Sequence, residues 1–204
     1  MTRIESIVYQ PLDRDYDDPT GDFLRVPLAS AVLVPGHGLS GDRKAGHNPE
    51  RQLNLLSAEW LAARAAEGYH AGRGQFGEQL IIAGLAVETL PAGTRLRLGG
   101  EAVIEITKGR NGCKRLEAAQ GKSIAGIGPI GALARVVTGG TISVGDGVAE
   151  IEQAETVLQI AIIFAIMLVL LFSASRIIAV IGNAGASVIS RVMGLILASV
   201  AVDG

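Results

Sequence analysis

Between residues 95 and 146, the chain contains short runs in which apolar and polar residues alternate. Residues 95–98 alternate leucine with arginine, and residues 102–107 place alanine or isoleucine at every second position. The two runs flank Gly99 and Gly100, which is the pattern of a β-hairpin. Residues 134–146 contain two more apolar runs around a second Gly-Gly pair. Four short strands are therefore predicted here.

One segment has helical instead of alternating spacing. Residues 57–67 carry apolar side chains at intervals that fit one face of a helix. Ser57 can cap the N-terminus of this helix, and Gly68 can end it. Trp60 and Leu61 are predicted to be core contacts.

The remaining segments also favour strands. Residues 23–34 are a strand region interrupted by Pro27, and residues 74–85 are predicted to be a turn that leads into a buried strand. A short helix is predicted directly after Cys113. Short strands at regular intervals with few helices indicate a mostly β fold, either a β-barrel or a sandwich.

The C-terminal part of the chain has a different character. Residues 156–175 are uncharged and strongly apolar, and as a helix they would be about 30 Å long, the thickness of a bilayer core. A second apolar run, residues 186–202, contains Arg191. We therefore predict a hydrophobic helical tail over residues 153–204, with one or two membrane segments.

The amino-acid composition agrees with a β domain followed by an apolar tail. The chain has 204 residues, of which 49% are hydrophobic and 19% charged, so one domain with an appendage is expected. The 27 glycines and the aromatic content of 4% indicate many tight turns. We predict an N-terminal strand and acidic loop over residues 1–23 and the β domain over residues 24–152. The net charge of -2, without a basic run, disfavours a nucleic-acid partner.

The chain has one cysteine, Cys113, which excludes an internal disulfide and suits a reducing compartment. Four cations lie within five residues of it: Lys108, Arg110, Lys114 and Arg115. Nearby positive charge favours the thiolate, the form that attacks sulfur or binds a metal. The alternative is a small apolar side chain that fills a gap in the core.

A glycine-rich stretch, residues 38–51, is the second candidate site. Arg43, Lys44 and Arg51 could hold a phosphate there with the help of backbone N–H groups. An ordinary surface loop is the alternative. The three histidines show no metal-ligand spacing with one another or with Cys113, so a zinc site is not expected.

Six motifs in order resemble the MOSC domain, named for the C-terminal domain of molybdenum cofactor sulfurases. They are GLSGDRKAG (38–46), RQLNLLSAE (51–59), GQFGEQLIIAGL (74–85), PAGTRLRLGGEAVIEIT (91–107), NGCKRLE (111–117) and ARVVTGGTISVGD (134–146). The resemblance covers about residues 24–150. It implies a β-barrel-like fold that binds the molybdenum cofactor, or carries sulfur for it.

The resemblance implies that Cys113 bears the sulfur or ligates molybdenum. The cofactor-binding candidates are Gly41, Asp42, Arg43, Arg51, Arg110 and Asn111. Two positions depart from the family pattern: Gly112 replaces a frequent proline, and Gln79 replaces a frequent asparagine.

The tail resembles the C-terminal end of the MarC family of membrane proteins. The sequence thus predicts a molybdenum-cofactor protein that acts through Cys113 by sulfur transfer or by molybdenum-dependent reduction, with a pterin cofactor or a sulfur-donor protein as partner. The chain would be anchored in a membrane, with the β domain in the cytoplasm. The alternative functions are a non-catalytic, membrane-tethered binding module and a component whose tail carries the function.

Overall fold

A computed structural model describes residues 1–12, 25–151 and 160–173. The chain divides into two compact units, Met1–Glu152 and Gln153–Gly204. Most of the acidic segment around residues 12–22 lies outside the described residues.

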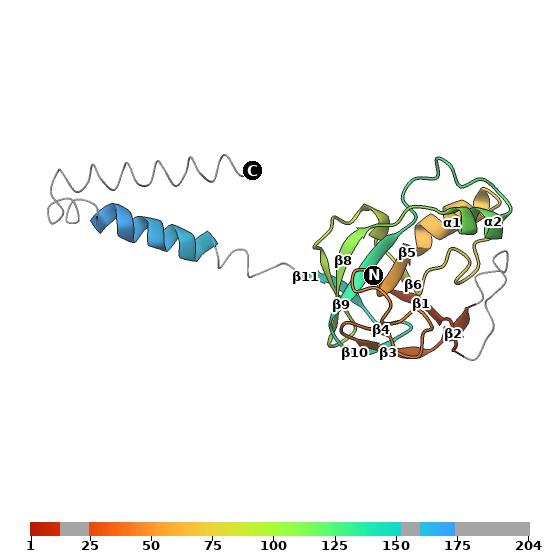
Figure 1. The fold of residues 1–204 in the computed structure, drawn as a ribbon, viewed down its shortest axis with the longest axis horizontal. Helices are drawn as coiled ribbons and strands as arrows, with labels where there is room; N and C mark the ends of the chain where they lie inside the picture. The colour runs from red at the N-terminus through yellow and green to blue at the C-terminus, as the bar shows by residue number, and fades with distance from the viewer. Residues whose placement is uncertain (13–24, 152–159, 174–204) are drawn as a thin grey trace. The chain divides into compact units, whose positions relative to one another are not determined.

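The first unit is mostly β, as predicted. The strands, in chain order, are β1 (Arg3–Tyr9), β2 (Val26–Leu28), β3 (Ser30–Val34), β4 (Gly38–Leu39), β5 (Leu53–Ser57), β6 (Leu80–Ala83), β7 (Arg95–Leu98), β8 (Ala102–Gly109), β9 (Ala132–Thr138), β10 (Gly140–Ser143) and β11 (Val148–Ile151). Eight of them form one sheet in the order β11-β7-β8-β9-β5-β6-β1-β2, and the other three form a sheet in the order β10-β3-β4. Figure 1 shows both sheets in one rounded domain.

The larger sheet curls until its β11 end meets β1, the strand next to its other end. The backbone N–H of Ile4, in β1, donates to the carbonyl of Asp146 at 2.8 Å, and the N–H of Gly145 donates to the carbonyl of Ile4 at 2.8 Å. The N–H of Val148, in β11, donates to the carbonyl of Thr2 at 3.1 Å. These bonds join the β11 end of the sheet to β1, which gives the domain its barrel-like form.

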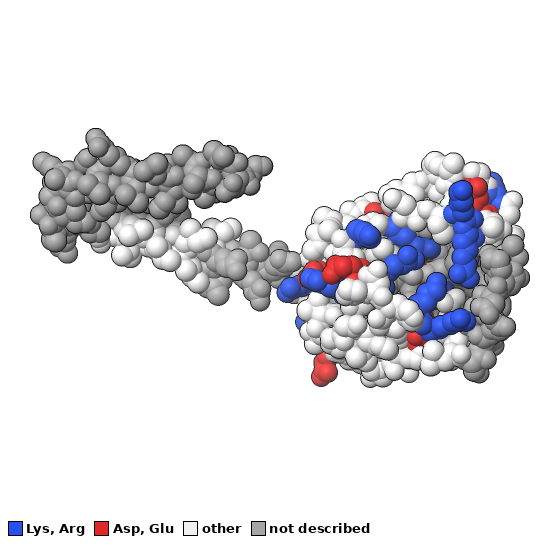
Figure 2. Space-filling model, in the orientation of Figure 1, with Lys and Arg blue, Asp and Glu red and all other residues white. Residues whose placement is uncertain are grey.

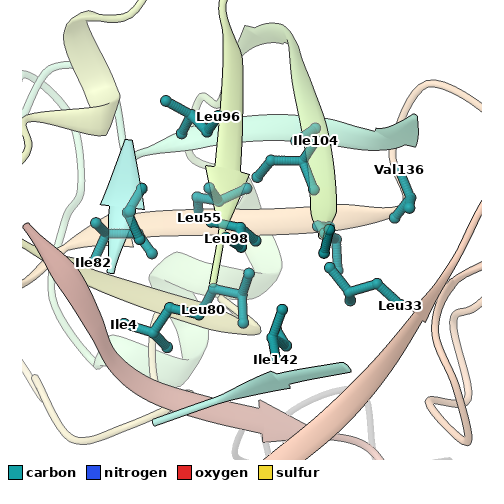
Figure 3. Close-up of a cluster of buried hydrophobic side chains, with 14 of the residues drawn as sticks. Ile4, Leu33, Leu55, Leu80, Ile82, Leu96, Leu98, Ile104, Val136 and Ile142 are labelled. Carbon is teal, nitrogen blue, oxygen red and sulfur yellow. The ribbon is translucent and has the colours of Figure 1, made fainter. Parts of the chain in front are cut away.

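The apolar side chains at alternate positions of the predicted strands are buried in the structure. In the predicted hairpin, β7 pairs antiparallel with β8, and Leu98 lies opposite Ala102. Leu96, Leu98 and Ile104 are fully buried, because every second side chain of a strand points to the same face. Figure 3 shows these side chains meeting Ile4 and others inside the barrel.

Two helices and a 3-10 turn complete the domain: α1 (Ala58–Ala66), η1 (Val87–Thr89) and α2 (Lys114–Gln120). The Ser57 hydroxyl accepts from the Trp60 N–H at 3.2 Å, so the predicted N-terminal cap is confirmed. α1 connects β5 to β6, which form a parallel pair.

A second apolar cluster lies under α1 and α2. Leu61 of α1 and Leu116 of α2 belong to the same buried cluster as Phe76, and Trp60 packs against Phe76 edge to face at a centroid distance of 5.1 Å. The predicted core roles of Trp60 and Leu61 are therefore confirmed. This cluster fixes both helices on the outside of the barrel.

The described part of the second unit is a helix over residues 160–173, with apolar side chains exposed along it. Among the residues that the structure describes, no helix has both the length and the apolar character needed to cross a bilayer. The predicted membrane segment 156–175 lies only partly within these residues. The predicted segment 186–202 lies outside them.

Candidate functional site

Cys113 opens onto a cavity of about 580 Å³ at the end of β8. We call it the cysteine cavity. Its lining residues are Asn48, Glu50, Arg51, Lys108, Gly109, Arg110, Asn111, Cys113 and Leu133. Four predicted site residues, Arg51, Arg110, Asn111 and Cys113, therefore share one cavity, although the first is far from the others in sequence.

The cysteine is exposed and lies at the first turn of α2. Its carbonyl accepts from the Glu117 N–H at 3.0 Å, while its side chain makes no capping bond. Leu116 anchors α2 in the core, so the sulfur is held at the surface by a packed helix. The alternative of a buried gap-filling cysteine is wrong.

Gly112, the departure from the family pattern, is packed closely. A Cβ at this position would overlap the Cδ1 atom of Ile124 and lie 3.1 Å from that of Ile130. The absence of a side chain therefore lets the cysteine loop lie directly on these two isoleucines.

Arg110 is the buried cation of the cysteine cavity, with 7% of its surface exposed. Its Nη2 donates to the Phe76 carbonyl at 2.5 Å, whereas its Nη1 has no hydrogen-bond partner among the residues that the structure describes. Burial lowers the pKa of Arg110 to about 10, and the negative charge of Glu78 opposes this shift. An orphaned guanidinium nitrogen is costly unless an anion completes it.

Glu78 organises the turn that Arg110 contacts. It is fully buried, and its two oxygens accept from the backbone N–H groups of Gly74, at 2.5 Å, and Phe76, at 3.2 Å. Burial raises the pKa of Glu78, an effect that the backbone N–H groups of Glu78 and Gly74 and the charges of Arg25 and Arg110 oppose without cancelling. The carboxyl thus shapes the turn whose Phe76 carbonyl holds Arg110.

The remaining polar lining comes from the loop before β5. The Asn48 side-chain oxygen accepts from the Glu50 N–H at 2.9 Å, and the Arg51 N–H donates to the Asn48 carbonyl at 3.2 Å. These local bonds form a turn that presents Arg51 to the cysteine cavity.

Three predicted site residues do not line the cysteine cavity. Gly41 occupies a turn with a φ of 80°, and a Cβ there would meet nothing within 4 Å. Arg43 lines a second cavity. Asp42 is buried: its oxygens accept from the N–H groups of Gln10, at 3.2 Å, and Lys44, at 2.8 Å, and Oδ2 lies 3.8 Å from Nη1 of Arg25. These contacts give Asp42 a structural role.

The substitution Asp42→Asn tests this structural role. Asparagine keeps the shape but removes the negative charge beside buried Arg25 and one acceptor oxygen. We expect the free energy of unfolding to fall by about 2 kcal/mol, the value of a buried hydrogen bond to a charged group. Urea unfolding measures it, with exposed Glu101→Gln as the control. An unchanged urea midpoint for Asp42→Asn would contradict the role.

The second cavity, of about 370 Å³, is lined by Gln10, Arg43, Lys44, His47 and Arg115. We call it the basic cavity. Figure 2 shows lysine and arginine side chains gathered on one face of the β domain. The chain as a whole has a net charge of -2, so folding concentrates positive charge locally.

The pKa of Lys44 responds to this local concentration of positive charge. Desolvation, followed by the positive charges of Arg25 and Arg115, lowers the pKa of Lys44 to about 8. We expect an NMR titration of the lysine side chains to show Lys44 losing its proton near pH 8. Arg115→Gln removes a like charge and should move the midpoint to higher pH, whereas Lys114→Gln should leave it in place. If the titration midpoint of Lys44 stayed the same in Arg115→Gln, Arg115 would not be a cause of the lowered pKa of Lys44.

The sequence did not single out Asn48 or Arg25. Asn48 acts through a backbone bond, and Arg25 contacts the Gly77 carbonyl at 2.9 Å, across 52 residues of sequence. Glu78 lies in the turn that was predicted to lead into a buried strand, and there it accepts from the N–H groups of Gly74 and Phe76. Nothing in the local sequence distinguishes Arg25 from a surface arginine.

The β domain is similar to several solved structures. YiiM from Geobacillus stearothermophilus has a TM-score of 0.59 and 18% identity, covering 75% of this chain and 76% of that one. YiiM from Escherichia coli has a TM-score of 0.53 and 22% identity, covering 74% and 71%. The YUAD protein from Bacillus subtilis has a TM-score of 0.54 and 17% identity, covering 72% and 94%. At sequence identities this low, the structural similarity shows a shared fold and nothing further.

Family models match both parts of the chain, whereas none of the curated proteins matches it. The model of the MarC family of integral membrane proteins matches residues 128–203. Its first residues, up to 149, overlap the other match and include β9 and β10 of the β domain. The MOSC domain model matches residues 42–149, more than half of the chain. The chain therefore belongs to the MOSC domain family.

Proposed function

We propose that the β domain binds the molybdenum cofactor in the cysteine cavity and uses Cys113 as the protein ligand of the metal. One observation carries this proposal: an exposed thiol shares a cavity with a buried arginine whose Nη1 has no hydrogen-bond partner within the described part of the chain. A thiophilic metal needs a sulfur ligand, and an anionic pterin phosphate needs guanidinium donors.

The residues of the cavity fit this group. A volume of about 580 Å³ lies in the range of small-molecule and cofactor sites, about 300–1,000 Å³. Arg51 and Lys108 add positive charge, and Asn111 adds an amide that can donate or accept. The chain has one cysteine, so Cys113 would be its only cysteine ligand to the metal.

Each residue then has a distinct task. Cys113 fixes the metal end of the cofactor, and Arg110 and Arg51 hold the phosphate and so orient it. The bound molybdenum would supply electron-transfer chemistry to a substrate. Glu50 and Asn48, on the opposite loop, limit the space in which that substrate can lie.

Sulfur transfer is the second candidate, and the exposure of Cys113 favours it. The Cys113 thiolate would attack the outer sulfur of a donor persulfide. A sulfur–sulfur bond forms at Cys113, the donor bond breaks, and the donor cysteine leaves as a thiolate. The exchange needs no external oxidant. It does require a donor protein that reaches the surface of the cavity.

Metal analysis and mass spectrometry of the purified chain separate the candidates. Stoichiometric molybdenum together with a released pterin supports the metal-ligand function. A sulfur adduct on Cys113 without molybdenum supports sulfur transfer. Neither molybdenum nor an adduct, under conditions that load other cofactor proteins, leaves the non-catalytic binding module.

Arg51→Gln tests the phosphate contact without removing the thiol. Loss of one charge-assisted hydrogen bond costs about 1.5–3 kcal/mol, so cofactor affinity should fall by about 10-fold or more. Cofactor retention is measured by the molybdenum content after dilution. Arg97→Gln, an exposed arginine of β7, is the matched control. Equal retention in both variants would show that Arg51 makes no such contact.

The tail is proposed to tether the β domain to a membrane. The MarC match and the exposed apolar side chains of residues 160–173 support this proposal. Deleting residues 156–204 should abolish flotation with lipid vesicles while cofactor content stays unchanged. Loss of the cofactor on deletion would instead assign the tail a part in the function itself.

A further inference from the structure

We propose that Thr107 is a positioning residue of the cysteine cavity. Its hydroxyl ties the loop that carries Arg51 to β8, the strand that leads to Cys113, and so fixes the two walls of the cavity relative to each other. What the cavity binds rests on the proposed function. The placement of Arg51 relative to the Cys113 sulfur does not.

Thr107 is the extra residue of a β-bulge in β8. Ile106 lies opposite Ala134 of β9. Lys108, two residues later, lies opposite Leu133, the next residue of β9, so Thr107 is extra to the register. The extra residue of a bulge is left out of the ladder, and the strand bends around it, a device that often re-aims side chains beside a functional site.

The bulge interrupts the alternation of β8. Strict alternation would place Lys108 on the same face as Ile104 and Ile106, whose side chains are buried in the core. Lys108 is instead exposed and lines the cysteine cavity. The end of β8 therefore contributes a cation to the cavity, and the Thr107 hydroxyl contacts another segment of the chain.

The Thr107 hydroxyl joins β8 to the loop before β5. Its Oγ1 lies 2.7 Å from the carbonyl oxygen of Glu50 and 3.1 Å from that of Leu133. The shorter bond, to Glu50, spans 57 residues of sequence. Arg51 follows Glu50 directly, and both residues line the cysteine cavity. The bond to the Glu50 carbonyl therefore holds the backbone from which the Arg51 side chain extends.

The same loop is also attached to β9, by the side chain of Gln52. Its Nε2 donates to the Pro49 carbonyl at 2.8 Å, and its Oε1 accepts from the Val136 N–H at 2.9 Å. Gln52 thus holds the loop on the sheet, whereas Thr107 holds it on the strand that continues to Cys113. We assign the relative placement of the two cavity walls to the Thr107 bond.

The test measures how fast Cys113 in the full-length chain reacts with two methanethiosulfonates, an anionic sulfonatoethyl reagent and a neutral hydroxyethyl reagent. Cys113 is the one cysteine of the chain, so the reaction has a single site. The cavity lining includes three cations, Arg51, Lys108 and Arg110, and one carboxylate, Glu50. Positive charge attracts the anionic reagent, so the ratio of the anionic to the neutral rate constant reports how close the cations lie to the sulfur.

Arg51→Gln sets the scale of this ratio. One unit charge a few ångströms away in water contributes about 1 kcal/mol, so its removal should lower the ratio by about 5-fold. Thr107→Val removes the hydroxyl at nearly constant size and should lower the ratio by at least about 2-fold, the effect of one hydrogen bond of about 0.5 kcal/mol. Thr107→Ser keeps the hydroxyl and should restore the wild-type ratio. Thr141→Val, at an exposed position of β10, is the matched control and should leave the ratio unchanged.

A double variant separates positioning from a general structural effect. In a chain that already carries Arg51→Gln, Thr107→Val should cause no further change in the ratio, because it acts through Arg51. An undiminished effect of Thr107→Val in that chain would overturn the proposal. Equal ratios in the wild type, Thr107→Val and Thr107→Ser would overturn it as well.

This result is independent of the proposed function, because the two reagents react with the chain in the absence of a cofactor. If the chain binds no molybdenum, the proposed function fails, and the comparison of Thr107→Val with Thr107→Ser still decides the positioning role. If the chain binds molybdenum but the ratio is unchanged in Thr107→Val, only the positioning role is refuted.

Discussion

A chain with Cys113→Ser should retain its fold but lose at least about 100-fold in molybdenum affinity and in any activity that depends on the metal. Substitutions of groups that merely orient a metal ligand cost 10–100-fold, and a direct ligand should cost no less. Serine has nearly the same size, but its oxygen is a poor ligand for a thiophilic metal. Metal content per chain after dialysis is the measurement.

Stability provides the control for this substitution. Cys113 is exposed and makes no side-chain hydrogen bond as the cap of α2, so the free energy of unfolding should change by less than about 0.5 kcal/mol. A folded Cys113→Ser chain with full molybdenum content and activity would refute both the metal-ligand and the sulfur-transfer functions.

Gly131→Ala should destabilise the β domain by about 3 kcal/mol or more. Gly131 has a φ of +79°, where any side chain adds about 1–2 kcal/mol of strain. Its Cβ would also overlap the carbonyl oxygen of Leu55 in β5, and overpacking adds about 1–3 kcal/mol. A backbone atom cannot rotate away as a side chain can, so β5 and β9 would have to separate. Urea unfolding measures the loss.

Gly128→Ala separates the two causes. Gly128 has nearly the same φ, +78°, but a Cβ there would meet nothing within 4 Å. We expect this variant to lose only the backbone strain, about 1–2 kcal/mol. If Gly128→Ala and Gly131→Ala lost similar amounts of stability, the overlap of the new Cβ with Leu55 would cost no free energy.

Gly131 also connects the fold to the site. The Arg110 N–H donates to the Gly131 carbonyl at 3.0 Å, and the Ile130 N–H donates to the Arg110 carbonyl at 2.7 Å. These bonds hold the backbone of the buried arginine. Displacing Gly131 should therefore weaken anion binding in the cysteine cavity as well as stability, although residue 131 does not line that cavity.

The strands were the most predictable part of the molecule. The alternation in residues 95–107 fixed both the β7–β8 hairpin and the faces that it buries, because side chains alternate along any strand. The helix over residues 57–67 was predictable from its cap, since Ser57 bonds within its own first turn. These elements depend on residues that are close together in the sequence, so one sequence is enough to predict them.

The site was only partly predictable. The cations around Cys113 are local in sequence, so they drew attention to a loop that lines the cysteine cavity in the structure. The motif resemblance added Arg51 to the same site, and the structure brings the two residues to one cavity. The resemblance also grouped Asp42 with them as a pocket residue, whereas Asp42 is buried and lines neither of the two cavities. A sequence motif records adjacency along the chain but not the direction in which each side chain faces.

By itself, the sequence determined a mostly β domain, a separate apolar tail and a cysteine set among cations, because each follows from local pattern and composition. Only the tertiary structure decided that Arg110 is buried with one nitrogen that no described residue bonds, that Glu78 shapes the turn which holds Arg110, and that the cations divide between two cavities. The bond from Arg110 to Phe76 and the linings of both cavities join segments that are far apart in the chain, so local sequence pattern does not reveal them.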